Sequence, residues 1–554
     1  MTHANTRKSG AVSTGFSIAA AAALALFATS AAHAAAPGIT STTGTPGSFI
    51  LNAGVGYSSQ PDGELIYSWG YGCAAGFTPT FAPAQFAAIG FCPLMQLPGP
   101  TLIVTEGTSF TVTLTNSLPA PAGNTSIIFP GLVTTSSNCG AAGSGTAQGL
   151  LTCEATNGGS VTYTVQIPVG SAGTHIYQSG TQPDLQIEMG LFGAVVVLPA
   201  TPPANCTAIE PGREDYRLAP AAYDHPLTCY DREYLFQWSE IDPRIHAQAL
   251  AQVNAAGNCT AGAAGCRLDV AMEPYHPNYY LINGRSMPDD MDANYAPNYP
   301  NQPYNGNPHM HPGELTLLRV TGQGHWQHPF HEHANHVRIL ARDAHLLLAQ
   351  ANDTTTYGLL AGRMEFNTDT TPGQALDGIF YWSGKGLGWD IFGHTPANGA
   401  ANPPCVPDVN GYYTTLSGAT PPSYTGNTMT GGSPNYYEWC ADHDVPLEAN
   451  PVSTNVAGTV GAGGPITLMD PLVLTNGLWY NGTPYLGPDA VNRSRGPTPL
   501  PPGAATQNPP AESGIAFMWH SHNEREITTN DVFPGGMLMI MLVDPYVWNI
   551  DETL

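Results

Sequence analysis

The residues best suited to chemistry in this chain form two short histidine clusters. Residues 328–333 read His-Pro-Phe-His-Glu-His, and residues 520–522 read His-Ser-His. Imidazole nitrogens bind copper, zinc, iron or nickel, and four histidines on two neighbouring strands can enclose one ion, or two ions with water or carboxylate completing the shells. We therefore predict a transition-metal site if the fold brings the two clusters together.

Several residues close to the clusters could act as extra ligands or could orient the ligands from behind: Glu332, Glu524, Glu526, His325 and His336. The alternative is that the histidines hydrogen-bond one another or water in a polar cleft, as buried polar groups must. A third motif, His309-Met310-His311, is expected in a surface loop, with at most a minor role in copper handling.

Other kinds of chemistry have no support in the sequence. It contains no glycine-rich phosphate loop, no Gly-x-Ser-x-Gly motif and no Cys-x-x-Cys pair. The 41 acidic side chains outnumber the 16 basic ones and give a formal charge of −25. Such a charge disfavours nucleic acids and anionic membranes as partners and mildly attracts cations, so a metal ion is the partner that we expect.

The first 34 residues read as a secretory signal peptide. Arg7 and Lys8 precede an apolar run at 16–29, and Ala32-His33-Ala34 resembles a cleavage site. The run is too short to anchor the chain in a bilayer. We therefore expect a periplasmic or secreted protein with no membrane insertion.

The ten cysteines fall into neighbours along the chain, and an even number in an exported protein favours disulfides. We predict that no free thiol remains and that the pairs are Cys73 with Cys92, Cys139 with Cys153, Cys206 with Cys229, Cys259 with Cys266, and Cys405 with Cys440.

Strand signals outnumber helical ones along the chain. Alternating apolar and β-branched residues predict strands within 101–116 and at 160–167, 193–198, 233–238, 315–320, 337–340 and 537–543. A single short helix is predicted around 245–254. Short strands separated by Gly, Pro and Asn turns indicate Greek-key β-sandwiches. Residues 393–433 and 496–512 are predicted to be long surface loops.

The histidine clusters and their surroundings resemble the copper motifs of the multicopper oxidases (laccases and relatives), from about residue 99 to residue 544. In that family the second cluster reads His-Cys-His, and its thiolate binds the type 1 copper and passes electrons to a trinuclear cluster. Here Ser521 stands at the position of the cysteine, and its hard oxygen cannot replace a soft thiolate. The resemblance thus implies cupredoxin-like domains without a normal type 1 copper.

The resemblance also implies a role for each histidine. His328 falls at a type 1 position, and the trinuclear positions are occupied by His331, His333, His520 and His522. The other trinuclear histidines of the family fall on Ile128, Pro130, Gln178 and Gly180, and a second type 1 histidine falls on Glu526. The implied site is a reduced one, with copper or another transition metal as its cofactor.

We expect an all-β protein of two or three cupredoxin-like Greek-key sandwiches with long loop insertions. The expected boundaries are 1–34 for the signal peptide, 38–200 for the N-terminal domain, 205–375 for a second domain and 376–554 for a C-terminal region, either separate from the second domain or continuous with it. Three functions stay open: binding of copper or another transition metal at the reduced site, an oxidoreductase with a remodelled mono- or dinuclear centre, and a metal-free scaffold. Standard laccase activity is not expected, and the sequence does not identify a protein partner.

Overall fold

The computed structural model describes residues 36–206, 215–349, 358–385, 406–426, 428–433, 435–441, 483–486, 513–544, 546 and 549–552. The predicted signal peptide and the predicted loop at 496–512 lie outside the described residues, as does part of the predicted loop at 393–433. No helix in the described ranges is both long and apolar enough to cross a membrane.

The N-terminal half of the described chain forms two five-stranded sheets. In the first sheet the order is β11 (Gly173–Gln178), β12 (Phe192–Leu198), β5 (Leu102–Thr105), β1 (Gly38–Ser41) and β4 (Thr80–Ala82). In the second it is β3 (Leu65–Cys73), β2 (Ser48–Ser59), β6 (Thr108–Asn116), β10 (Ser160–Ile167) and β7 (Val133–Ser136).

The C-terminal half forms two further large sheets. One contains β14 (Tyr279–Ile282), β13 (Arg232–Ile241), β16 (Leu315–Gly322), β22 (Ala375–Tyr381), β18 (Val337–Arg342) and β19 (His345–Leu346), with β20 (Met364–Glu365) paired to β18. The other contains β15 (His309–Met310), β27 (Leu538–Val543), β26 (Ser513–Ser521), β17 (Pro329–Glu332) and β21 (Asn367–Asp369), with β25 (Thr483–Leu486) paired to β26.

The remaining regular elements are short. Two hairpins are formed by β8 (Thr146–Gln148) with β9 (Cys153–Ala155) and by β23 (Ser423–Thr425) with β24 (Thr428–Gly431). The described α-helices are α2 (Pro183–Glu188) and α3 (Pro243–Ala256), and α3 overlaps the predicted helix. The strands predicted from alternation are all present, so the predicted all-β class is confirmed.

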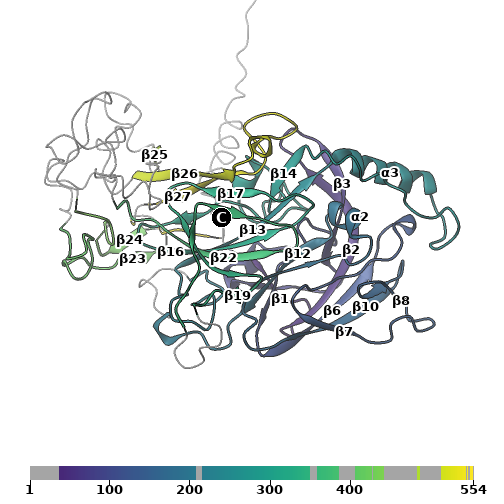
Figure 1. The fold of residues 1–554 in the computed structure, drawn as a ribbon, viewed down its shortest axis with the longest axis horizontal. Helices are drawn as coiled ribbons and strands as arrows, with labels where there is room; N and C mark the ends of the chain where they lie inside the picture. The colour runs from purple at the N-terminus through teal and green to yellow at the C-terminus, as the bar shows by residue number, and fades with distance from the viewer. Residues whose placement is uncertain are drawn as a thin grey trace, which may run out of the picture.

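Each pair of large sheets encloses one hydrophobic core. In β6 the inward residues Phe110, Val112 and Leu114 alternate with more exposed ones, as expected for a strand with one buried face. The second core joins Phe236 of β13 to Trp519 of β26. In Figure 1 the purple and blue N-terminal strands accordingly lie on one side and the green and yellow strands on the other.

Strand β22 begins at the expected boundary between the second domain and the C-terminal region. It is hydrogen-bonded to β16 on one side and to β18 on the other. Strands from both sides of residue 375 therefore share a sheet and a core. We propose that the ranges 205–375 and 376–554 together form one enlarged sandwich.

Buried polar contacts join the two halves of the chain. The backbone N–H and the hydroxyl of Thr174 in β11 both donate to the carboxylate of Asp377 in β22, at 3.0 and 2.6 Å. Tyr223 donates to the same carboxylate at 2.5 Å. All three residues are buried, so these hydrogen bonds favour one relative placement of β11 and β22.

The motif His309-Met310-His311 is buried, so the expectation of a surface loop is wrong. His309 and Met310 form β15, which pairs with β27, and Nδ1 of His309 lies 2.6 Å from Asp544. His311 stacks against Tyr546, with 4.4 Å between the ring centroids. No local pattern indicates that the C-terminal segment covers this motif.

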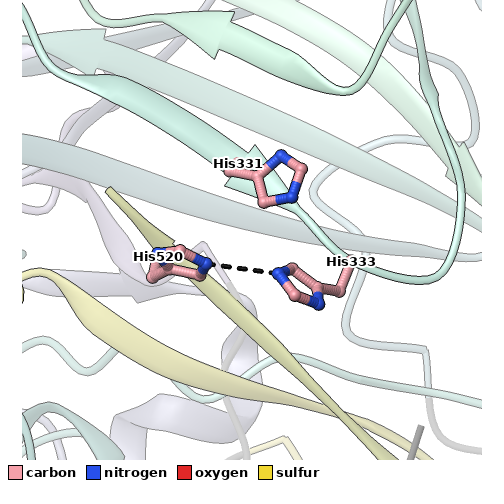
Figure 2. A group of neighbouring side chains, drawn as sticks. All are labelled: His331, His333 and His520. Atoms are coloured by element: carbon pink, nitrogen blue, oxygen red, sulfur yellow. Dashed lines mark hydrogen bonds between the residues drawn. The ribbon is translucent and has the colours of Figure 1, made fainter. Parts of the chain in front are cut away.

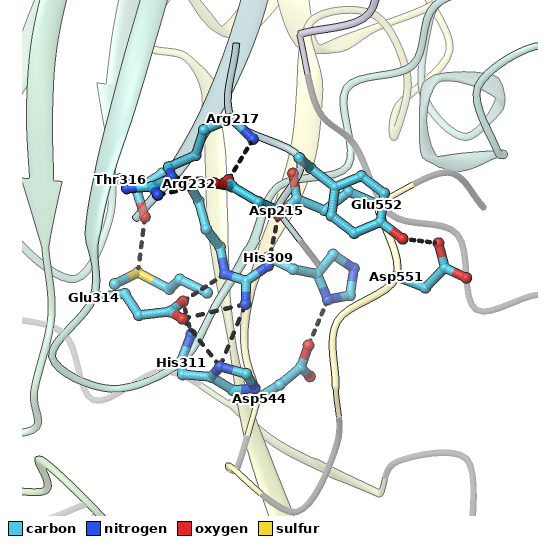
Figure 3. A network of polar contacts seen from close by, with 12 residues as sticks. Asp215, Arg217, Arg232, His309, His311, Glu314, Thr316, Asp544, Asp551 and Glu552 are labelled. Atoms are coloured by element: carbon cyan, nitrogen blue, oxygen red, sulfur yellow. Dashed lines mark hydrogen bonds and ion pairs between the residues drawn. The ribbon is translucent and has the colours of Figure 1, made fainter. Parts of the chain in front are cut away.

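Beside this motif lies a buried network of charges (Figure 3). Arg232 of β13 binds Glu314 through Nε at 2.5 Å and Glu552 through Nη1 at 2.6 Å. The three side chains are 0–3% exposed. The network ties residues near the C-terminus to the start of β13.

Four of the five predicted disulfides are present: Cys73–Cys92, Cys139–Cys153, Cys206–Cys229 and Cys259–Cys266. Cys440 is also disulfide-bonded, but Cys405 lies outside the described residues. The described residues include no free cysteine.

Candidate metal centre

Strands β17 and β26 bring the two histidine clusters together. They pair antiparallel, with His331 opposite His520 and Phe330 opposite Ser521. Phe330 lies in the core, and successive side chains of a strand point to opposite faces. His331 and His520 therefore share the outer face of the sheet, whereas Ser521 shares the inner face with Phe330.

Three histidines offer nitrogen atoms that all lie within 4.8 Å of one another: His331, His333 and His520. Figure 2 shows the three rings turned toward a common space, with a dashed line between His333 and His520. The two Nε2 atoms joined by that line are 3.2 Å apart. His522 is exposed and its ring centroid lies 4.9 Å from that of His331, so it borders the group without belonging to it.

Backbone carbonyls orient two of these rings. Nδ1 of His331 lies 2.6 Å from the carbonyl oxygen of Phe366, and Nδ1 of His520 lies 2.7 Å from that of Ser521. A carbonyl oxygen only accepts, so each Nδ1 carries the hydrogen and each Nε2 keeps its lone pair. Metal-binding histidines commonly show this arrangement, in which the second ring nitrogen is held by a backbone carbonyl.

The three rings are neutral at pH 7. Burial, together with the neighbouring histidines, lowers the pKa of His331 and that of His333 to about 4 each. Burial also lowers the pKa of His520. Neutral imidazole is the form that binds metals, so binding at neutral pH displaces no proton from these rings. The donor set therefore fits a transition-metal ion.

His328 lies apart from this group, on the inner face with Phe330. Its Nδ1 is 2.9 Å from Glu526 and its Nε2 is 3.0 Å from Glu240. The ring is fully buried and stacks on Trp238. Burial alone would lower the pKa of His328, but the two carboxylates outweigh it and raise that pKa to about 9. His328 is therefore an imidazolium between two carboxylates.

Ser521 belongs to the same polar network. Its hydroxyl donates to Glu526 at 2.5 Å, on the carboxylate oxygen that also faces His328. The positions that the resemblance assigns to a type 1 copper thus carry a serine and a histidine that both hydrogen-bond to one glutamate. Glu240 was not predicted from the sequence, because it is one of several polar residues along β13 and lies in no recognisable motif.

The other residues suggested as extra or orienting ligands lie in different environments. Glu332 is buried, accepts a hydrogen bond from Thr368, and has a pKa raised well above its usual value by burial. Glu524 is exposed. His325 faces the backbone oxygen of Asp184. His336 packs edge-on against Phe366, whose carbonyl orients His331.

The positions of the four missing histidines lie in the N-terminal half. Ile128 and Gln178 face each other across a β-bridge, with backbone hydrogen bonds of 2.8 and 3.2 Å. Gly180 lies against Ile128, and a Cβ atom there would be 2.7 Å from the Ile128 side chain. This part of the chain supplies apolar and amide side chains where the resemblance would require imidazoles.

The imidazolium of His328 predicts a stability that falls with rising pH. Its usual pKa of 6.5 is raised to about 9 in the folded protein. Protonated His328 stabilises the folded state by about 3 kcal/mol. This stabilisation is fully present below pH 6.5 and is lost as the pH rises through about 9. Urea unfolding of metal-free protein between pH 6 and 9.5 measures this loss. The variant His328→Gln is expected to lose less stability over that range than the parent; equal losses would contradict the assignment.

Comparison with known proteins supports the family resemblance in the N-terminal half. Residues 95–202 match the family model described as multicopper oxidase, so the predicted resemblance is confirmed over that segment. No curated protein sequence matches the chain.

Solved structures with similar chain traces include two copper oxidases. One is the multicopper oxidase mgLAC, at 12% identity and a TM-score of 0.41, covering 90% of this chain and 85% of the other. The second is a blue copper oxidase from Nitrosomonas europaea, at 13% identity and a TM-score of 0.41, covering 89% and 85%. Both likenesses are too distant to support an inference about activity.

Proposed function

We propose that this chain binds copper, or another transition metal, at a reduced histidine site without a normal type 1 copper. The observation that carries the proposal is the group of three nitrogen donors from His331, His333 and His520 within 4.8 Å of one another. His522, beside His331, is placed to become a fourth ligand by a side-chain movement. We leave His328 out because both of its ring nitrogens face carboxylates.

A bound copper ion would supply a Lewis acid and a one-electron redox centre. The chain's own contribution is the orientation of the rings. The carbonyls of Phe366 and Ser521 fix the tautomers of His331 and His520, and burial keeps the rings neutral. The exposed side chain of His522 leaves one edge of the group accessible to solvent.

Two features favour a metal-binding protein over an oxidase that uses a relay of several copper ions. Ser521 is committed to Glu526 and offers no thiolate. The positions of four histidines in the family carry Ile128, Pro130, Gln178 and Gly180 instead. The type 1 position therefore lacks its thiolate, and the trinuclear position lacks four of its histidines.

We further propose that residues 1–34 direct export to the periplasm or beyond. The four described disulfides support this proposal, because such bonds persist mainly in oxidising compartments. The net charge of −25 agrees with a protein that does not bind nucleic acid.

The test is metal analysis combined with spectroscopy of the purified protein. Copper should bind with a defined stoichiometry and raise the melting temperature, because a ligand that prefers the folded state stabilises it. The copper-loaded protein should lack the intense charge-transfer band of a blue site, and oxygen consumption with phenols should be slow at most. A blue band would contradict the ligand assignment, and rapid phenol oxidation would favour the oxidoreductase. Failure to bind copper, zinc, iron or nickel would favour the third alternative, a metal-free scaffold protein.

A further inference from the structure

A cavity lies in the chain that separates β22 from β26, and its lining shares no residue with the histidine group. Residues 406–441 contribute most of the lining of a cavity of about 570 Å³. That volume is within the usual range for a site that binds a small molecule. Its lining includes the tyrosines Tyr412, Tyr436 and Tyr437, with Lys385 and Asn410.

The aromatic rings are held in place by one another. Tyr412 packs against Tyr437 at 5.8 Å and edge-on against Trp439 at 5.1 Å, measured between ring centroids. Tyr436 packs against Tyr437 at 5.9 Å. The ammonium group of Lys385 lies 5.1 Å from the Trp439 ring. These contacts form a continuous aromatic group beside the cavity.

Glycines make room for two of the rings. A Cβ atom on Gly411 would lie 2.2 Å from the Trp439 ring, and one on Gly313 would lie 2.2 Å from the Tyr437 ring. Tyr437 itself has a φ of 61°, which is rare for a bulky residue and is retained only where the surroundings enforce it. Tyr437 is nevertheless 36% exposed. Tyr437 is thus held against Gly313 and its neighbouring tyrosines, while about a third of the residue stays exposed beside the cavity.

The polar rim of the cavity is also fixed. Asp408 accepts backbone hydrogen bonds from Asn410 at 2.8 Å and from Tyr412 at 3.1 Å, and a hydroxyl hydrogen bond from Thr414 at 2.8 Å. These bonds hold the turn that carries the exposed side chains of Asn410 and Thr415. The rim therefore combines an amide, a hydroxyl and the ammonium group of Lys385 with aromatic faces.

We propose that this cavity binds a carbohydrate, with a pyranose ring stacked on Tyr437. The C–H groups on the face of a sugar ring are apolar and slightly positive, and the face of an aromatic ring is slightly negative. The hydroxyl groups around the sugar's edge need hydrogen-bond partners, which Asn410, Thr415 and Lys385 supply. A purely apolar ligand would leave these polar groups desolvated without partners.

The test uses the full-length protein and titrates it with glucose, cellohexaose, xylohexaose and chitohexaose by calorimetry and intrinsic fluorescence. At least one of them should bind saturably, and Tyr437→Ala should weaken that binding about tenfold or more. Tyr437→Phe keeps the ring and should retain binding. The matched control Tyr57→Ala removes a tyrosine that is 47% exposed on β2 and should change nothing. Binding of glucose alone would indicate a free sugar, and binding of the oligomers alone would indicate a polymer.

Three results would overturn the proposal. They are no saturable binding of any of the four sugars, binding that survives Tyr437→Ala unchanged, and binding of catechol in place of sugars with the same sensitivity to Tyr437→Ala. Melting temperatures of all variants establish that each protein is folded.

Discussion

Replacing Arg232 with methionine is expected to lower the free energy of unfolding by about 3–5 kcal/mol. The guanidinium group is fully buried and binds both Glu314 and Glu552. Methionine would leave the two carboxylates without their main counterion, and the cost of burying unpaired charge is larger than the net value of the pair itself. Urea unfolding at pH 7 measures the change.

A second arginine provides the control for this experiment. Arg363 also binds a carboxylate, that of Glu365, but its side chain is 80% exposed. Surface ion pairs are screened by water and contribute little, so Arg363→Met should leave the unfolding midpoint almost unchanged. Equal effects of the two substitutions would show that the buried network does not stabilise the fold in the way described.

Replacing His333 and His520 together with alanine is expected to abolish specific metal binding. Loss of a group that only orients a ligand typically costs about 10–100-fold in metal affinity, and loss of two ligands should cost more. The metal-dependent rise in melting temperature should vanish with the binding. Titration of metal-free protein with copper or zinc, followed by calorimetry, measures both effects.

The matched control is His345→Ala, which removes an exposed histidine outside the group. This variant should bind metal as the parent does. Retained binding in the His333 and His520 variant, or an equal loss in the His345 variant, would mean that the metal binds elsewhere. The melting temperature of the metal-free form of each variant establishes that the variant is folded.

The fold could be predicted from local patterns to a large extent. The alternation in β10 predicted its bounds at residues 160–167, because one face of that strand is buried and the other is exposed. Cysteine spacing predicted five disulfides, and the four that lie wholly within the described residues close separations of 7 to 23 residues. Both are short-range features, in which sequence neighbours are also neighbours in space.

The environment of His328 could not be predicted in the same way. Its partner Glu240 is 88 residues away along the chain and lies in no recognisable motif. A buried glutamate becomes recognisable only when the sheet places an imidazole beside it. The family resemblance suggested a metal ligand at this position, whereas the structure places an imidazolium there, between two carboxylates.

The burial of His309 and His311 was missed for a related reason. Their neighbours include Asp544 and Tyr546, more than two hundred residues further along the chain. The short motif looked polar and therefore exposed. Long-range pairing of β15 with β27 decides its burial, and local composition does not report such pairing.

The most direct test of the metal site is anomalous diffraction at the copper absorption edge from crystals of the copper-loaded protein. We expect an anomalous peak between His331, His333 and His520, with His522 turned toward it, and no peak among His328, Ser521 and Glu526. A peak at the second position, or the absence of a peak beside the three histidines, would contradict the proposed metal site.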